Sequence, residues 1–279
     1  MQRRDTNFYY SFVVLPDAER RAIVAVWDFC RAVDDAVDET AGAPGDPQRR
    51  ADAAAELARW RQELDACFAG RDCATDQGRN LVVHAARFGL PRKSFEDVID
   101  GVGMDLNARR YATFDDLREY CLRVASAVGL ICLDIFGARD ERSRQYAIDL
   151  GMALQLTNIL RDLGRDLGAG RLYLPLDDLA RFGVTEDDLR AGAMTGPIRA
   201  LLDFEARRAR DFYARAAAEM PRTDARRLVA ARIMGAIYFD LLERIERSDY
   251  DVFEQTIRTP RWRKVVIAGR IWCAAKVGL

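Results

Sequence analysis

The chain has 279 residues, of which 49% are hydrophobic and 31% charged, so it can bury a large core and has no bias toward disorder. Its 43 basic and 44 acidic residues leave a formal charge of −1, which excludes the strongly basic surface of a nucleic-acid-binding protein. No stretch approaches the length of an uncharged membrane span, and Pro16, Asp17 and Glu19 interrupt the apolar segment behind the paired arginines near the start. We therefore expect a globular, cytoplasmic protein.

Helical periodicity runs through nearly the whole chain, and no alternating segment is long enough to build a sheet. The first predicted helix opens at Pro16 and runs to about Glu39, where the glycine- and proline-rich segment 41–47 forms the clearest loop. Further helices are predicted over 48–68, 79–88, 92–108, 114–137, 140–167, 196–219, 223–247 and 261–277. The segment 168–195 is predicted as a structured loop that carries one short helix.

The pattern predicts a single domain over residues 1–279, because no repeat or long linker divides the chain. The segment from Val124 to Phe136 is apolar almost all round, which is typical of a central helix surrounded by others. A central helix beside acidic helices describes an all-α, single-domain helical bundle with a central cavity.

Cysteine and histidine usage argues against a zinc site. The six cysteines include no Cys-x-x-Cys pair, and His84 is the single histidine. Cys30, Cys121 and Cys132 lie within apolar helical patterns, which is typical of buried, reduced thiols. Such thiols agree with a cytoplasmic location.

An acidic stripe marks the end of the first predicted helix. Trp27, Arg31, Asp34 and Asp38 are spaced so that they lie along one helical face. The two carboxylates repel each other across one turn, and a cation between them relieves this repulsion. Carboxylate oxygens suit Mg²⁺, with Mn²⁺ as an alternative, and the ion can also bind substrate phosphate. Taken alone, the stripe is explained more simply as an exposed acidic helix end.

A second polar stripe, formed by Gln155, Asn158, Asp162 and Asp166, lies on a helix whose reverse side is apolar. Buried carboxylates without partners are costly, and a metal ion supplies the partner. Two such helices facing each other would hold metal ions between them, with a diphosphate completing the coordination. The two stripes together favour a metal and diphosphate site over a solvated surface.

Both stripes and their flanking residues resemble the squalene/phytoene synthase family. The matching segments are 29–38, 120–129, 158–166 and 170–175, and the similarity extends from about Phe8 to Tyr250. The resemblance implies the isoprenoid synthase fold and a Mg²⁺-dependent prenyltransferase, which joins two allylic diphosphates head to head through a cyclopropylcarbinyl diphosphate. The segment 258–264 resembles bacterial presqualene diphosphate synthases and squalene synthases of the hopanoid pathway.

The resemblance also implies roles for individual residues. The implied metal ligands are Asp34, Asp38, Asn158, Asp162 and Asp166, the catalytic residues Tyr120, Arg161, Tyr173 and Tyr238, and the substrate-binding residues Arg31, Trp27, Gln155, Arg171, Phe8 and Phe12. Guanidinium groups match phosphate oxygens, although each arginine has an alternative partner in a neighbouring aspartate. Aromatic rings stabilise a carbocation in a dry cavity.

Two positions depart from the family pattern. The stretch before the first helix has Asp5 and Thr6 where relatives commonly have serine, so a hydroxyl contact with diphosphate is in doubt there. Trp27 stands where relatives often have tyrosine, and an indole N–H donates a hydrogen bond but cannot accept one.

The expected reaction is condensation of two farnesyl diphosphates to presqualene diphosphate with release of diphosphate, and the step onward to squalene or dehydrosqualene is left open. Full reduction needs NADPH, for which the sequence has no recognisable site. The alternative is a phytoene synthase that condenses two geranylgeranyl diphosphates. A catalytically silent Mg²⁺-binding protein and a class I terpene cyclase are the competing hypotheses of other classes.

Residues 255–279 contain six basic residues, no acidic residue, and Trp262 and Trp272. Two interpretations stay open: a packed terminal helix with a solvated basic side, and a peripheral helix in contact with an anionic membrane surface. No feature of the sequence predicts an oligomeric state.

Overall fold

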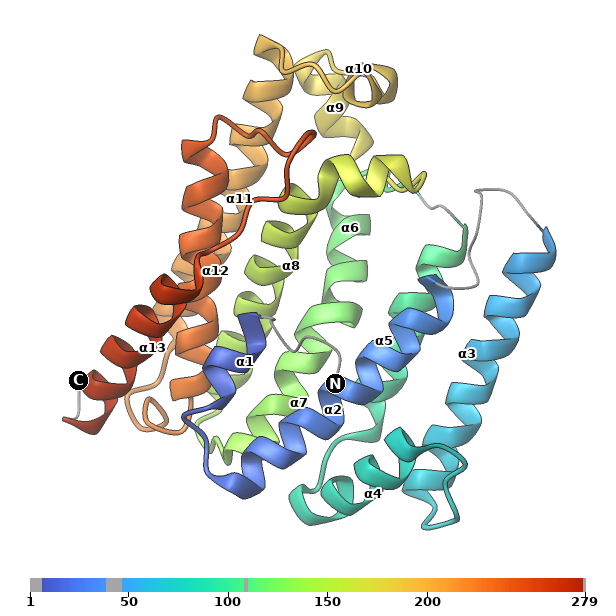
Figure 1. Cartoon of the computed structure of the whole chain (residues 1–279), viewed down its shortest axis with the longest axis vertical. Coiled ribbons are helices and arrows are strands. Elements are labelled where there is room, and N and C mark those ends of the chain that lie inside the picture. Colours follow the sequence, from blue (N-terminus) through green and yellow to red (C-terminus); the bar gives the residue numbers. More distant parts are fainter. Residues whose placement is uncertain (1–6, 39–46, 108–109, 278–279) are drawn as a thin grey trace.

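Helices make up most of the described part of the chain, which comprises residues 7–38, 47–107 and 110–277 of this computed structural model. No β-strand occurs within these ranges, which confirms the predicted all-α class (Figure 1). The long helices run alongside one another as a bundle, with the shorter α9 (Leu176–Phe182) and α10 (Glu186–Arg190) at its upper end and α4 (Asp76–Phe88) at its lower end. The predictions of one domain over residues 1–279 and of a central cavity stay predictions.

The first part of the chain contains α1 (Asn7–Phe12), α2 (Asp17–Asp38), α3 (Pro47–Phe68), α4 (Asp76–Phe88) and α5 (Arg92–Met104), followed by a 3₁₀ turn (Asp105–Asn107). The second part contains α6 (Phe114–Cys121), a π-helical segment (Leu122–Ser126), α7 (Ala127–Phe136), α8 (Arg142–Gly168), α9 (Leu176–Phe182), α10 (Glu186–Arg190), α11 (Gly196–Glu219), α12 (Val229–Arg247) and α13 (Arg261–Lys276). The bounds of α3, α8, α11 and α13 agree closely with the predicted helices.

The segment 168–195 was predicted to hold one short helix and holds two, α9 and α10. A reciprocal cap explains the second. The Thr185 hydroxyl accepts a hydrogen bond from the Asp188 N–H at 3.1 Å, and the Asp188 carboxylate accepts one from the Thr185 N–H at 2.8 Å. The prediction was wrong here because this cap stabilises a helix too short to display an apolar period.

The helix predicted over 223–247 begins only at Val229, because a buried carboxylate holds the preceding residues in turns. Asp224 accepts hydrogen bonds from the backbone N–H groups of Arg139 and Asp140, both at 2.7 Å, and from the Ser143 hydroxyl at 2.9 Å. This side chain caps the start of α8 from outside its own helix. α1, which precedes the first predicted helix, is a further element that the pattern did not predict.

The helix predicted over 114–137 is interrupted by the π-helical segment, against which two neighbouring helices pack closely. A Cβ atom added to Gly151 of α8 would lie 2.7 Å from the Ser126 Cα, and one added to Gly101 of α5 would lie 2.6 Å from the Val124 Cγ1. Both glycines therefore let a helix backbone approach the widened turn.

The core is centred on α8, which packs against α7, α11, α12 and the π-helical segment. One apolar cluster joins α8 to α11 and α12, and a second joins α2, α3, α4 and α5 to α7. Phe12, Leu154 and Tyr213 are only partly buried and contact both clusters. The carboxyl ends of α2, α5 and α8 all lie toward the upper end of the bundle (Figure 1). The fold thus brings the ends of three helices from distant parts of the sequence to one end of the molecule.

Candidate active site

The polar stripe of α8 lies on a helix whose other side belongs to the core, as the sequence predicts. Leu156, Ile159, Leu160 and Leu163 are all buried. On the stripe, Asp162 is buried as well, and Gln155, Asn158 and Asp166 are partly buried. Polar groups at this depth need partners, because their desolvation costs free energy.

Arginines of the same helix compensate the charge of Asp162. The Arg161 guanidinium donates to both Asp162 oxygens, at 2.8 Å for the Nε–Oδ1 contact, and Arg165 approaches the same carboxylate at 3.0 Å. Arg161 is thus held as an ion-pair partner here, the alternative that the sequence left open for it. Its guanidinium stays within the site, on the same face as the remaining polar groups.

Asp166 is less well compensated. Burial and the neighbouring charge of Asp162 raise its pKa to about 6, although Arg165, Arg171 and Arg161 act in the opposite direction. A further positive charge beside this carboxylate would favour its ionised form. The site therefore has unmet demand for a cation at the carboxyl end of α8.

Asn158 provides an independent indication of a cation. Its side-chain Oδ1 is buried and has no hydrogen-bond partner among the described residues, while its amide donates to the Gln155 Oε1 at 3.5 Å. A buried acceptor without a donor costs about 1–3 kcal/mol. Hard divalent ions prefer oxygen ligands such as this amide oxygen and the neighbouring carboxylates, so the residues of α8 fit a Mg²⁺ ion.

The acidic stripe of α2 is more exposed than that of α8. Asp34 is exposed, and Arg31 contacts Asp35 at 3.4 Å on the solvent side. Asp38 is the last residue of α2, and its side chain lies outside the described residues, as do those of Phe8 and of the preceding stretch. Asp34 nevertheless acts on the interior: burial is the main cause of the raised pKa values of Cys30 and Asp105, and the charge of Asp34 adds a smaller contribution to both.

Asp105, which the sequence analysis missed, joins two of the predicted catalytic tyrosines. Its Oδ2 accepts a hydrogen bond from the Tyr120 hydroxyl at 3.0 Å, and its Oδ1 accepts one from the Tyr173 hydroxyl at 2.8 Å. The Tyr120 and Tyr173 rings stack with their centroids 5.2 Å apart. Asp105 is a single acid at the end of an apolar helical pattern, so no spacing signal distinguishes it in the sequence.

Burial raises the pKa of Asp105 to about 7, although the two tyrosine hydroxyls and Arg171 act in the opposite direction. Burial and the charge of Asp105 in turn raise the pKa values of Tyr120 and Tyr173. The carboxyl group can therefore gain or lose a proton near neutral pH, whereas both phenols stay protonated.

A turn after α8 brings Arg171 and Tyr173 to this group. The Arg171 N–H donates to the Asp166 carbonyl at 2.7 Å, and Gly170 occupies the left-handed region with φ of 77°. Beyond the turn, the Leu176 N–H donates to the Tyr111 carbonyl at 2.9 Å, which anchors the segment. The charge of Arg171 opposes the effect of burial on the pKa values of both Asp105 and Asp166. Arg171 therefore lies close enough to act on the tyrosine group and on the α8 stripe together.

Three further predicted residues are at least partly buried. Tyr238 of α12 is buried, and after Asp162 it contributes to the raised pKa of Arg161, so these two side chains lie close together. Trp27 of α2 and Phe12 of α1 are partly buried, and Phe12 packs at the junction of the two apolar clusters.

The raised pKa of Asp105 predicts a pH-dependent stability. Because the folded pKa exceeds the ordinary value of 3.8, the buried charge destabilises the fold increasingly as the pH rises through about 7. Relative to the wild type, the free energy of unfolding of Asp105→Asn should therefore increase by roughly a few kcal/mol between pH 5 and pH 8. Urea unfolding at several pH values measures this difference. Asp115→Asn, an exposed control, should give a constant difference, and a constant difference for Asp105→Asn would refute the assignment.

The cation demand of α8 predicts two opposite effects of one substitution. Without metal at pH 8, Asp166→Asn should raise the thermal midpoint, because it removes a charge whose pKa of about 6 reports a cost of ionisation. With Mg²⁺ and inorganic pyrophosphate, the midpoint of the wild type should rise and that of the variant should rise much less. Thermal scans of both proteins, with the exposed Asp211→Asn as control, test this. Equal metal-dependent shifts in all three proteins would exclude Asp166 from the metal site.

Comparisons with known proteins agree with this geometry. The squalene/phytoene synthase family matches residues 1–263. The chain is 38% identical over 276 residues to the 15-cis-phytoene synthase of Synechococcus elongatus, which covers 93% of this chain and 85% of that one. It is 37% identical over 241 residues to the presqualene diphosphate synthase of Rhodopseudomonas palustris, with 85% and 82% covered.

A solved structure gives the same result for the fold. The crystal structure of a dehydrosqualene synthase in complex with a ligand superposes with a TM-score of 0.83 at 28% identity, covering 98% of this chain and 93% of that one. This match identifies the bundle as the isoprenoid synthase fold. Members of this family are prenyltransferases that condense two prenyl diphosphates head to head and depend on Mg²⁺. By the extent of both matches, this chain belongs to the squalene/phytoene synthase family.

Proposed function

We propose that the protein condenses two molecules of farnesyl diphosphate to presqualene diphosphate, releasing one diphosphate and one proton. The observation that carries the proposal is the convergence of the α8 stripe, Arg171 and the Asp105–tyrosine group at one end of the bundle. Such a centre combines groups that hold a polyanion with groups that stabilise and deprotonate a cation.

The diphosphate end of the substrate is assigned to the acidic stripes and their arginines. Mg²⁺ held by Asp34, Asp38, Asn158, Asp162 and Asp166 would neutralise the charge that develops on the departing diphosphate. Arg161 and Arg171 supply guanidinium groups that bind its oxygens. The pKa of Arg161 is raised, chiefly by its Asp162 partner against the opposing effect of burial, so this group keeps its charge throughout the reaction.

The Asp105–tyrosine group is assigned to the carbocation and to the proton. Closing the cyclopropane ring releases one proton, and a carboxyl group with a pKa of about 7 can accept it near neutral pH. The stacked rings of Tyr120 and Tyr173 present π-faces that stabilise positive charge. Asp105 keeps both hydroxyls oriented, so that neither is free to act as a competing nucleophile.

The length of the prenyl chain is the finer part of the proposal. The resemblance of residues 258–264 to presqualene diphosphate synthases and the similarity to the Rhodopseudomonas palustris presqualene diphosphate synthase support the fifteen-carbon substrate. The phytoene synthases that are 38% and 40% identical support a second candidate, condensation of two twenty-carbon geranylgeranyl diphosphates. Phe12, at the junction of the apolar clusters, is the residue we assign to the end of the prenyl chain.

Product identification by mass spectrometry tests this function directly. The enzyme with Mg²⁺ should convert farnesyl diphosphate to presqualene diphosphate and use geranylgeranyl diphosphate poorly, because a rigid floor rejects a longer chain by overpacking. NADPH in a parallel reaction reveals whether the product continues to squalene. Phe12→Ala should admit the longer substrate, while Asp162→Asn should lower turnover of either substrate by orders of magnitude with helicity intact.

Each contrary result points to a different function. Equal or better use of geranylgeranyl diphosphate by the wild type would favour a phytoene synthase. A cyclic product from one substrate molecule would indicate a terpene cyclase. Absence of pyrophosphate release with folded, Mg²⁺-loaded protein would indicate a catalytically silent binding protein.

We propose further that α13 rests on an anionic membrane surface, from which the apolar substrate and product exchange. No described helix is long and apolar enough to span a bilayer. The outward side of α13 is instead apolar, with Trp262 64%, Val265 57% and Trp272 41% exposed. Val265 and Trp272 also line an apolar cleft of about 240 Å³ together with Val13 and Val14 of the α1 end.

The basic residues near α13 divide into two groups. Arg263 contacts Asp240 at 2.8 Å and Lys264 is buried near the Tyr10 ring, so these two belong to the packing of the helix. Arg258, Arg261, Arg270 and Lys276 are exposed beside the apolar side. Exposed tryptophans next to cations are typical of helices that lie at the interface of anionic lipid.

Sedimentation with lipid vesicles measures this contact. The protein should bind vesicles of phosphatidylcholine with phosphatidylglycerol more than vesicles of phosphatidylcholine alone, and less at high salt, because the exposed cations are screened. Trp272→Glu should reduce binding several-fold. Val83→Glu, at a valine of α4 that is 63% exposed, is the matched control and should bind as the wild type does. Equal binding of both variants, or none by the wild type, would contradict the proposal.

A further inference from the structure

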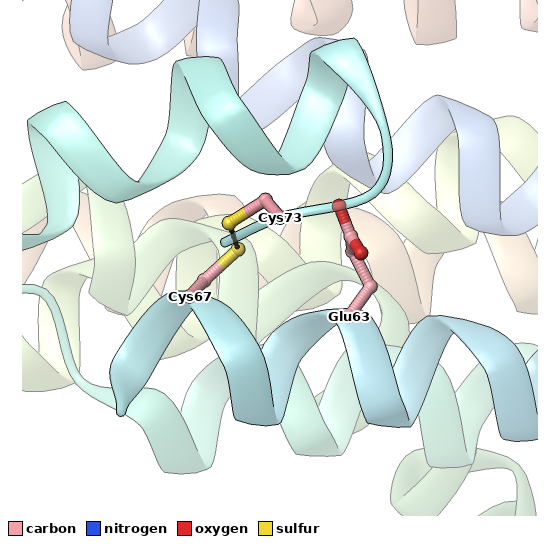
Figure 2. Close-up of side chains that lie close together, drawn as sticks. All are labelled: Glu63, Cys67 and Cys73. Atoms are coloured by element: carbon pink, nitrogen blue, oxygen red, sulfur yellow. Dashed lines mark hydrogen bonds between the residues drawn. The ribbon is translucent and has the colours of Figure 1, made fainter. Parts of the chain in front are cut away.

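A pair of buried cysteines lies outside the active site, at the junction of α3 and α4 (Figure 2). Cys67 is in the last turn of α3, and Cys73 follows in the turn that leads to α4. They are 3% and 9% exposed, and their sulfur atoms are 2.9 Å apart. Glu63, one turn before Cys67, is the third side chain of the group.

The Glu63 carboxylate binds the loop before α4 and is therefore not available as a ligand for a metal ion. Its Oε1 accepts hydrogen bonds from the Thr75 N–H at 2.8 Å and the Thr75 hydroxyl at 2.7 Å, and its Oε2 accepts one from the Ala74 N–H at 2.9 Å. Gly78 leaves no spare room here, since a Cβ atom at that position would lie 2.0 Å from the Glu63 Oε1. The carboxylate thus holds the turn that carries Cys73.

The two sulfur atoms are also too close together for ligands of one ion. Two thiolates on a tetrahedral zinc ion, with bonds of about 2.3 Å, are roughly 3.8 Å apart. The Cys67 and Cys73 sulfurs are 2.9 Å apart and therefore contact each other directly. Cys67 also donates toward the Gly78 carbonyl at 3.4 Å, which keeps its side chain turned toward the same loop.

We propose that Cys67 and Cys73 are the two halves of a reversible disulfide site. Two S–H bonds break and one S–S bond forms, and the two protons and two electrons pass to an oxidant such as a low-molecular-weight disulfide, which becomes two thiols. Glu63 holds the turn that presents Cys73 to Cys67, so little reorganisation is needed. Under reducing conditions the pair remains a dithiol.

Burial makes this site slow to react but does not block it. Desolvation, Cys73 and Glu63 all raise the pKa of the Cys67 thiol, which disfavours the thiolate that attacks an oxidant. Oxidation should therefore be faster at alkaline pH. Once an oxidant has reacted with one thiol, the adjacent second thiol displaces it intramolecularly.

The position of the pair predicts what the bond changes. α3 and α4 pack against each other and against α2, and the α3–α4 turn lies at the opposite end of the bundle from the carboxyl end of α2 (Figure 1). A cross-link there restricts the unfolded chain and fixes the turn, but it does not reach the diphosphate site. We expect it to change stability and leave turnover unaltered.

Peptide mapping of the full-length protein detects the bond, because Arg71 lies between the two cysteines. The protein is treated with oxidised glutathione at about pH 8.5, which favours the thiolate. Trypsin should then release peptides 62–71 and 72–79 as one disulfide-linked species. The reduced protein should release them separately. Glutathione adducts on these cysteines without the linked species would overturn the proposal.

Thermal scans provide the second readout. The oxidised wild type should melt about 3–6 °C above the reduced protein. Cys67→Ser and Cys73→Ser should lose this difference, whereas Cys273→Ser, at an exposed cysteine of α13, should keep it. An unchanged midpoint after complete cross-linking would refute the stabilising role.

Incubation of the reduced protein with Zn²⁺ alone separates the remaining possibility. Our proposal expects no tightly bound zinc after gel filtration, for the wild type and for Cys73→Ser alike. One equivalent of zinc that is retained by the wild type and lost in Cys73→Ser would replace the disulfide site by a metal site. These readouts need no prenyl substrate, so they do not depend on the proposed condensation.

Discussion

Nearly buried negative charge on α8 is the constraint on which the rest of the site depends. Asp162 and Asp166 lie one turn apart on a helix whose other side is packed in the core. Arg161 and Arg165 compensate the first carboxylate, but the pKa of the second is still raised to about 6. The negative charge of this helix is therefore only partly compensated by its own residues. The buried Oδ1 of Asn158, which has no hydrogen-bond donor among the described residues, adds to this deficit of positive partners. The deficit is the physical basis of cation binding.

The turn after α8 extends this electrostatic system to the tyrosines. Gly170 permits the left-handed backbone that reverses the chain, and Arg171 then acts on Asp166 and Asp105 together. Asp105 in turn fixes the hydroxyls of Tyr120 and Tyr173. One arginine therefore links the α8 carboxylates to the Asp105–tyrosine group, which agrees with the separation of anion and cation in the proposed reaction.

A helical bundle also keeps separate functions apart. The proposed diphosphate site lies at one end, the Cys67–Cys73 pair at the α3–α4 turn, and the exposed apolar side chains of α13 on the outer surface. Each uses the end or the outward side of a helix, where side chains are not needed for the core. If the proposed disulfide and membrane contact form, they would act on stability and location without rearranging the residues of the α8 stripe.

The sequence by itself determined the helical class, most helix positions and the two polar stripes, because helical period and carboxylate spacing are local properties. It also indicated Tyr120, Tyr173 and Arg171, although only through the family resemblance. The π-helical segment and the start of α12 at Val229 depended instead on tertiary contacts, namely the backbone approach of Gly151 and the hydrogen bonds of Asp224.

Tertiary structure alone decided the role of two groups. The Asp105 side chain receives its hydrogen bonds from Tyr120 and Tyr173, which α6 and the turn after α8 bring to it from distant parts of the sequence. Cys67 and Cys73 belong to no sequence motif, and the hydrogen bonds of Glu63 bring them into contact. In both groups, the chemistry of a residue depends on partners that come from other elements of the fold, and the helical period of the sequence carries no information about these partners.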